Sequence, residues 1–340
     1  MRLCRRRISR NRRLMGWRFL RWREWSRRWS TAGSKESVMS RRLLFLFGAG
    51  ASYGAGGTLP EQPPLGTQLF DVLERQFPST WGRLPGDVAA QFRNNFEMGM
   101  RVVYDSFGMA VPQLMRDMAI FFIQFRPYLR RTLYCRLIDD LRKTDKLNES
   151  IFSTLNYDCV LEFSMSEAKV PFSYFDAVGE TICPLWKLHG SSNFFSAGIQ
   201  ASQGIAYSTG VVFDAGIQAL PDSNRVIEHC LVETGLAPIM CLYMEGKPTS
   251  VSPSAIKRIQ EQWTEAVSTA KAIFCIGVNP HLPDEHIWNP LAKTQAKLYF
   301  IGDENNFSQW SATNRSQPAQ FLGSRFGEAY RHLLERIDEI

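Results

Sequence analysis

The chain has 340 residues, with 40 Lys and Arg against 33 Asp and Glu and a formal net charge of +7. Its content of 44% hydrophobic and 12% aromatic residues is typical of a globular protein and excludes a mainly disordered or fibrous chain. No run of residues approaches the roughly 20 apolar residues that a membrane-spanning helix needs, which excludes such a span. The apolar stretch at 119–125 predicts a core helix instead.

The positive charge is confined to the first part of the sequence. Residues 1–42 contain 14 Arg and 1 Lys against two Glu, a net of +13, which leaves 25 basic and 31 acidic side chains, a net of −6, for residues 43–340. In residues 1–38, Trp alternates with Arg, and such side chains can dock on phosphates and stack on bases, or lie at a membrane surface. The alternative that we favour is a disordered tail or a misplaced start ahead of Met39, so nucleic acid is an expected partner only through this tail.

The first predicted strand is the continuous apolar run at 43–47, which is typical of a parallel strand covered on both faces. It leads into Gly48-Ala-Gly-Ala-Ser52, a glycine turn of the kind that lets backbone N–H groups approach a pyrophosphate at the start of a helix. By itself, a plain tight turn is an equally good interpretation. Residues from about 67 to 148 then show helical spacing, with a break expected at Pro127.

Further strands are predicted where short apolar runs end in polar or glycine residues, at 150–154, 184–188, 272–276 and 298–301. A helix is predicted at 254–269, between the second and third of these strands. Strands that alternate with helices indicate a doubly wound α/β sheet, and such sheets bind ligands at the carboxyl ends of their strands. The Gly-, Ser- and Ala-rich region 191–250 has weak periodicity, and a lid is one hypothesis for it.

Two strand ends carry candidate catalytic side chains. Asn156 and Asp158 can aim an amide and a carboxylate at one ligand, although the alternative is that both cap the helix that follows. His189, followed by Gly190, ends the next strand, and its imidazole is suited to general-base work, although a lone histidine is more often structural. Each signal alone is weak.

The seven cysteines are scattered and never form a C-x-x-C pair: Cys4, Cys135, Cys159, Cys183, Cys230, Cys241 and Cys275. This argues against a disulfide framework and against a structural zinc site, which needs close pairs of ligands. We therefore expect no bound metal and a reducing, cytoplasmic location.

Taken in order, the glycine turn, Thr154-Leu-Asn-Tyr-Asp158, Lys187-Leu-His-Gly190 and the segment from Ile276 to His286 resemble the motifs of the sirtuin-like (SIR2-like) family. The resemblance runs from about residue 43 to 304. It implies that residues 39–340 form a SIR2-like domain in which a Rossmann-like parallel sheet, flanked by helices, binds NAD. It also implies a smaller helical insertion, at about 67–148.

The resemblance assigns roles to individual residues. Asn156 and Asp158 would bind the nicotinamide ribose and orient a water, and His189 would act as general base toward a ribose hydroxyl. The remaining residues would contact the cofactor: Gly48, Ala49, Gly50, Ala51, Ser52 and Thr154 on one side, and Gly277, Asn279, Gly302 and Asp303 on the adenosine side. Whether Asp284 and His286 contact the ligand or fix their loop is left open.

The sequence departs from protein-deacylating sirtuins, because the two C-x-x-C zinc pairs beside the acyl-lysine channel are missing. This combination is similar to bacterial SIR2-like effectors of anti-phage defence, which hydrolyse NAD to nicotinamide and ADP-ribose. The sequence therefore predicts an NAD hydrolase gated by self-assembly or by a regulatory partner protein. A non-catalytic sensor of NAD or ADP-ribose is the alternative, and a protein deacylase is less favoured.

Overall fold

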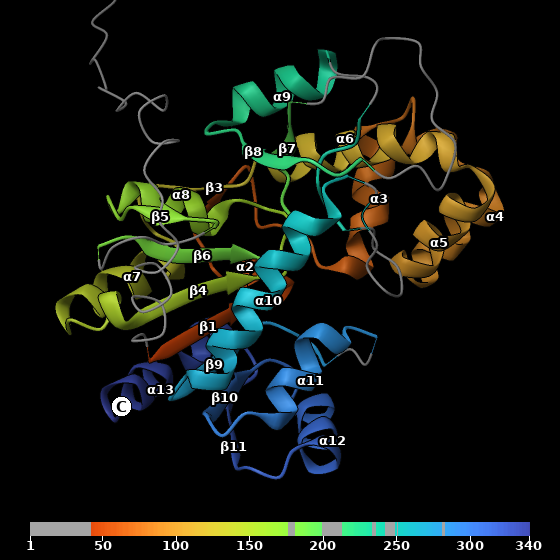
Figure 1. Cartoon of the computed structure of the whole chain (residues 1–340). Helices are drawn as coiled ribbons and strands as arrows, with labels where there is room; N and C mark the ends of the chain where they lie inside the picture. The colour runs from red at the N-terminus through yellow and green to blue at the C-terminus, as the bar shows by residue number, and fades with distance from the viewer. Residues whose placement is uncertain are drawn as a thin grey trace, which may run out of the picture.

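The structure, a computed structural model, describes residues 42–175, 181–198, 213–232, 236–241, 249, 251–280 and 283–340. Its centre is a seven-stranded parallel sheet with helices on both faces (Figure 1). The predicted fold class, an α/β Rossmann-like sheet flanked by helices, is confirmed. The basic tail at 1–38 and parts of region 191–250, namely 199–212, 233–235, 242–248 and 250, lie outside the described residues.

The strands of the main sheet are β1 (Leu43–Phe47), β4 (Ser150–Thr154), β5 (Phe172–Ser173), β6 (Cys183–Lys187), β9 (Ala272–Ile276), β10 (Lys297–Ile301) and β11 (Ala319–Gly323). Two antiparallel pairs are formed by β2 (Thr58–Leu59) with β3 (Arg126–Pro127), and by β7 (Phe194–Ala197) with β8 (Gly216–Ala219). The helices are α2 (Ala49–Tyr53), α3 (Gly66–Gln76), α4 (Gly86–Asn94), α5 (Phe96–Ser106), α6 (Val111–Phe122), α7 (Leu133–Lys143), α8 (Val160–Glu167), α9 (Ser223–Val232), α10 (Pro253–Thr269), α11 (Glu285–Lys293), α12 (Glu304–Asn314) and α13 (Phe326–Asp338).

Aromatic side chains hold the central strands in register. Phe45 of β1 lies directly opposite Phe152 of β4 and Phe274 of β9, and its ring stacks on both, with centroids 5.4 and 5.1 Å apart. Phe274 in turn stacks on Tyr299 of β10 at 5.0 Å. Each such pair contributes roughly 0.5–1.5 kcal/mol beyond its buried area, so a slip of one residue would lose the whole row.

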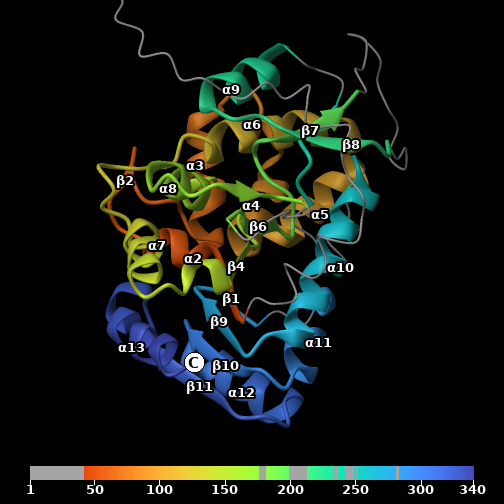
Figure 2. The same cartoon turned by 60° about the vertical axis from the view of Figure 1, so that its left-hand side comes forward.

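The two faces of the sheet are covered by different helices. Leu44 and Leu46 pack in a core with residues of α10, α11 and α12, whereas Phe45 and Phe47 pack in a second core with α2, α7, α8 and α13. Figure 2 shows α10 and α11 on one side of the strands and α7 and α13 on the other. The continuous apolar run of β1 is therefore explained by burial on both faces.

Helices α3 to α6 form a group of their own beside the sheet (Figure 1). An aromatic cluster lies inside this group, in which the Phe92 ring stacks on Phe70 at 4.9 Å and contacts Trp81 at 5.4 Å. Helix α7 instead packs against α8, and β3 at Pro127 lies between α6 and α7, where the break was predicted. The limits of the predicted insertion at 67–148 stay a prediction.

Most predicted strands match the observed ones within one residue, and the predicted helix at 254–269 is α10. Ile256, Ile259, Trp263 and Val267 form one apolar face of α10 and are buried. None of the helices that the structure describes is long and apolar enough to cross a membrane.

The order of the strands in the sheet is β11-β10-β9-β1-β4-β6-β5. From β1 the chain proceeds to β4, on to the edge strand β5 and back to β6, and then returns to place β9 on the other side of β1. Between β1 and β9 the winding direction therefore reverses, and in open α/β sheets the ligand crevice lies outside the carboxyl ends of the strands at such a point. The residues that follow β1 and β9, together with those that follow the neighbouring strands β4 and β6, form the candidate site.

Candidate functional site

The glycine turn after β1 lies directly against the glycine that ends β9. Gly277 has φ +63°, and a Cβ on this residue would lie 1.9 Å from the backbone nitrogen of Ala51. On the other side of the contact, a Cβ on Gly48 would lie 2.5 Å from the carbonyl oxygen of Gly277. Only glycine permits these approaches, so the turn and Gly277 are matched to each other.

Most N–H groups of the glycine turn are already engaged within the protein. Gly48 donates to the carbonyl of Ile276 at 3.0 Å, Gly50 donates to that of Gly277 at 2.9 Å, and Ala51 donates to that of Gly48 at 2.9 Å. These bonds tie the ends of β1 and β9 together. The predicted contact of this whole turn with phosphates stays a prediction.

Asn156, in the loop after β4, holds the turn from the other side. Its Nδ2 donates to the carbonyl oxygen of Gly48 at 2.9 Å and to Oγ of Ser52 at 3.0 Å. No hydrogen bond from the described residues reaches its Oδ1, which leaves that oxygen for a ligand. The amide orientation follows from this network, since both hydrogens of Nδ2 have acceptors.

Asp158 makes the helix-capping contact that was one of its two alternatives, whereas its contact with a ligand stays a prediction. Its Oδ1 accepts from the backbone N–H of Val160 at 3.0 Å, at the start of α8, and from Oγ of Ser52 at 3.3 Å. Burial raises the pKa of Asp158, and the nearby Lys187 ammonium and these two hydrogen bonds oppose the rise. The side chain therefore contacts the start of α8, and its carboxyl group, whose pKa is raised, also lies at the candidate site.

A buried ion pair stabilises the loop that carries Asp158. The Nζ atom of Lys187, in the last position of β6, lies 2.9 Å from Oε1 of Glu162 in α8, and both side chains are buried. The same ammonium donates to the backbone carbonyl of Asp158 at 2.6 Å. The pair thus fixes the backbone that carries Asp158. Removal of either partner would leave the other charge buried without compensation, which is strongly destabilising.

Ser52 connects the polar side chains of the site. Its hydroxyl contacts Asn156 and Asp158 as described, and its Oγ lies 3.1 Å from the hydroxyl of Tyr134, a residue of α7. The residue is 1% exposed. Its observed contacts are all with protein side chains, so its predicted contact with the cofactor also stays a prediction.

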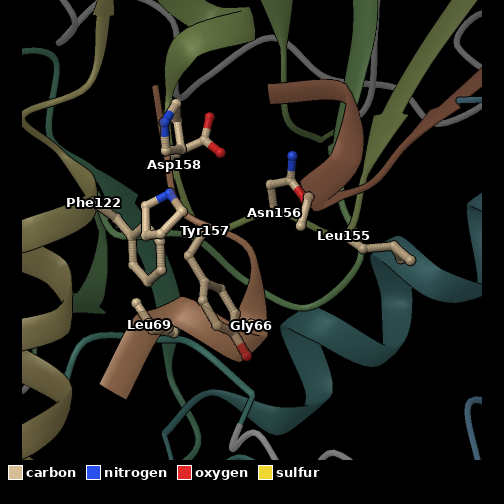
Figure 3. Close-up of a pocket in the computed structure, with 10 residues that line it drawn as sticks. Gly66, Leu69, Phe122, Leu155, Asn156, Tyr157 and Asp158 are labelled. Atoms are coloured by element: carbon tan, nitrogen blue, oxygen red, sulfur yellow. The ribbon is translucent and has the colours of Figure 1, made fainter. Parts of the chain in front are cut away.

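A cavity of about 40 Å³ opens beside these residues. Asn156 and Asp158 line it together with Ala49 of the glycine turn, and Gly66, Leu69 and Phe122 of the helical group close it from the other elements. Figure 3 shows the Asn156 amide and the Asp158 carboxylate on one side of the pocket, with Leu69 and Gly66 on the other. The volume is that of one or a few water molecules, so the cavity places water next to an amide and a carboxylate.

His189 lies two residues beyond β6 and is 5% exposed. Its Nε2 faces Nε2 of His286, in the first turn of α11, at 3.0 Å. One ligand atom each from His189, His286 and Asp284 lie within 4.8 Å of one another. Asp284 and His286, which follow β9 in the chain, therefore lie near the end of β6, and His286 contacts the predicted general base.

The other predicted residues have local structural roles as well. Oγ1 of Thr154 accepts from the N–H of Asn156 at 3.0 Å. Beyond β10, the Asp303 carboxylate accepts from the N–H of Asn306 at 2.8 Å and caps α12, and Oδ1 of Asn279 accepts from Nδ2 of Asn306 at 3.0 Å. The N–H of Gly302 donates to the carbonyl of Gly323 at 3.1 Å. These residues lie at the ends of β9 and β10, on the far side of the crevice from Asp158.

Sequence reasoning missed three residues that support the site. Lys187 and Glu162 were not recognised as a pair, although a lysine that ends an apolar strand was a usable signal. Tyr134 gave no signal, because its contact with Ser52 spans 82 positions of the chain.

No protein family model matches the chain, and no curated relative was found for it. Among solved structures it is similar to a sirtuin from a study of substrate affinity, with a TM-score of 0.41 and 13% identity over 90% of this chain and 96% of the other. It is also similar to a mutant Sir2 with a p53 peptide and NAD, with a TM-score of 0.40 and 12% identity over 90% and 97% of the two chains. TM-scores of this size are low, and the fold class follows from the topology of the sheet itself.

Proposed function

We propose that the protein is an NAD hydrolase that cleaves NAD to nicotinamide and ADP-ribose. The observation that carries the proposal is the water-sized cavity at the end of β4, where Asn156 and Asp158 meet Ala49 of the glycine turn. It lies beside the point at which the sheet reverses its winding, where α/β sheets bind nucleotides. The order of the four sequence motifs supports the same substrate.

The reaction needs few groups. The bond between C1′ of the ribose and the pyridinium nitrogen breaks, its electron pair neutralises the ring, and nicotinamide leaves without a general acid. The oxygen of a water bonds to C1′, and the proton of that water passes to a base. In the proposed site Oδ1 of Asn156 and the Asp158 carboxylate orient this water, and the raised pKa of Asp158 suits proton acceptance closer to neutral pH.

Release of nicotinamide from NAD, followed by chromatography with purified full-length protein, tests the proposal. We expect Asn156→Ala and Asp158→Asn to lower the rate about 100-fold or more, in line with the loss of a positioned acid–base group. His189→Ala tests the predicted base in the same assay. Asn314→Ala is the matched control, because its Nδ2 donates only to the Trp310 carbonyl in α12. Absence of nicotinamide release from the wild-type protein, alone or after self-assembly, would refute the proposal.

One observation favours the second candidate, a sensor that binds NAD or ADP-ribose without turnover. Nε2 of His189 faces His286, so the predicted base is engaged within the protein. Tight binding of ADP-ribose by calorimetry, with NAD recovered unchanged, would support the sensor. A protein deacylase is less favoured because the chain has no C-x-x-C pair, and formation of O-acetyl-ADP-ribose from an acetylated peptide would revive it.

The physiological part of the proposal is anti-phage defence by depletion of NAD, and it rests on the resemblance of the motifs alone. The six described cysteines are free thiols. In infected cells that express the protein, NAD should fall with the wild-type chain and persist with Asn156→Ala. A homo-oligomer or a regulatory partner is proposed to gate the activity, and size-exclusion chromatography with and without NAD tests the oligomer. Deletion of residues 1–38 tests whether any salt-sensitive nucleic-acid binding depends on the tail.

A further inference from the structure

We propose that His189, Asp284 and His286 form a binding site for one divalent transition-metal ion of the zinc class. The inference goes beyond NAD hydrolysis and does not depend on it. It also departs from our expectation of no metal, which considered only cysteine pairs.

The geometry of the donor atoms carries the proposal. The two imidazole Nε2 atoms lie 3.0 Å apart, and a carboxylate oxygen of Asp284 completes a group whose ligand atoms all lie within 4.8 Å. Two nitrogens bound to one tetrahedral zinc at about 2.0–2.1 Å lie roughly 3.3 Å apart. An increase of a few tenths of an ångström in the distance between the two Nε2 atoms would therefore admit the ion.

The position of Asp284 is a second, independent observation. It is the N-cap residue of α11, and an aspartate there normally accepts a hydrogen bond from the first turn, which stabilises a helix by about 1 kcal/mol. The Asp284 side chain makes no such bond, and only its backbone carbonyl accepts from Ile287 and Trp288. The carboxylate, which belongs to a residue 6% exposed, is instead within reach of the two imidazoles.

The chemistry of the donors selects the class of ion. Two neutral imidazoles and one carboxylate carry a charge of −1, which suits a divalent cation. Imidazole nitrogen favours Zn²⁺ and its transition-metal neighbours over Mg²⁺ and Ca²⁺, which prefer oxygen ligands. Three protein ligands would also leave a fourth position for water or another small ligand.

The three residues come from two distant parts of the sequence. His189 follows β6, whereas Asp284 and His286 follow β9, and these strands are separated in the sheet by β1 and β4. A bound ion would link the two halves of the crevice across the proposed nucleotide site. It would also occupy Nε2 of His189, so the loaded protein should hydrolyse NAD more slowly than the metal-free protein.

Calorimetric titration of tag-free, chelator-treated full-length protein with ZnCl₂ tests the site. We expect one Zn²⁺ per chain, and binding weaker by at least about tenfold in Asp284→Asn and His286→Gln, since even the outer partners of metal ligands change affinity by about 10–100-fold. Titration with Co²⁺ should give the visible absorption of a four-coordinate ion. His332→Ala is the matched control, because this histidine lies in α13, where its Nδ1 is 3.3 Å from the Leu322 carbonyl oxygen, and it should bind Zn²⁺ like the wild type.

Circular dichroism and thermal unfolding establish that each variant is folded, and the near-isosteric replacements keep this comparison available. Absence of saturable Zn²⁺ binding, or equal binding by the wild type and both ligand variants, would overturn the proposal. The first result would leave the His189–His286 contact as a simple hydrogen bond. Because binding is measured without NAD, failure of this site and failure of the proposed hydrolysis are distinguishable.

Discussion

Gly277 packs directly against the backbone of Ala51: a Cβ on Gly277 would lie 1.9 Å from the backbone nitrogen of Ala51. The contact joins the end of β9 to the short helix α2, and the bond from the N–H of Gly50 to the Gly277 carbonyl reinforces it. The crevice at the reversal of winding is thus formed by backbone against backbone. Its shape depends on the absence of side chains at Gly277 and Gly48.

Gly277→Ala should destabilise the protein by more than about 3 kcal/mol, because the new Cβ adds a clash with the backbone to the cost of a positive φ. Gly56→Ala is a matched control: Gly56 has φ +64°, but a Cβ there meets nothing within 4 Å. The control should cost only about 1–2 kcal/mol. Urea denaturation measures both, and equal losses would show that the close approach contributes nothing.

The sequence predicted the main strands well, because continuous apolar runs such as 43–47 leave few alternatives to a buried parallel strand. It did not predict β11 or α13, which follow the last recognised motif. The small strands β7 and β8 lie in or beside the Gly- and Ser-rich region, where periodicity is weak. Elements formed by residues close together in the sequence could be predicted. The pairing of β9 with β1, which are far apart in the sequence, could be seen only in the structure.

The candidate site was predicted in part for the same reason. Asn156, Asp158 and Ala49 were singled out by their places at strand ends, and the structure brings them to one cavity. The contact of His189 with His286 joins residues 97 positions apart, and no local pattern encodes such a pairing. The engagement of Ser52 with Tyr134 was hidden in the same way.

Lys187→Met should destabilise the fold by about 3–5 kcal/mol, because it leaves the buried Glu162 carboxylate without its ammonium partner. In Lys187→Met with Glu162→Leu, neither charge is buried, so much of the loss should be recovered. A double-mutant cycle in urea measures the coupling between the two residues. Additive losses from the two single changes would contradict a stabilising pair.

Asp158→Asn should change how the stability of the protein depends on pH. Because burial raises the pKa of Asp158, its protonated form is favoured in the folded protein, and the associated stabilisation is present below the ordinary value of 3.8 and lost as pH rises through the raised value. Asparagine is neutral throughout and can still accept from Val160 and Ser52. Relative to wild type, the variant should therefore gain stability as pH rises from below 3.8 to neutral, as thermal unfolding at a series of pH values would show. A constant difference across that range would contradict the raised pKa.

Six described cysteines should be unreactive in the native protein. All six are buried, and burial raises the pKa of Cys159, Cys230 and Cys275 to about 12, which keeps them as thiols near neutral pH. Titration of a Cys4→Ser variant with a thiol reagent should therefore show almost no reaction until denaturant is added, and six thiols afterwards. Rapid reaction of several thiols in the native state would show that these cores open readily.

Ser52→Ala should impair catalysis through positioning, provided that the proposed hydrolysis holds. The hydroxyl contacts Asn156 at 3.0 Å and Asp158 at 3.3 Å, so its loss should lower kcat about tenfold while KM for NAD changes little. Tyr134→Phe is the matched comparison, because it removes only the 3.1 Å contact on the far side of Ser52 and leaves both bonds to the site residues. We expect this second change to lower kcat less than Ser52→Ala does, with similar losses of stability. An equal fall in kcat for the two variants would mean that general destabilisation, rather than the orientation of Asn156 and Asp158, accounts for the effect.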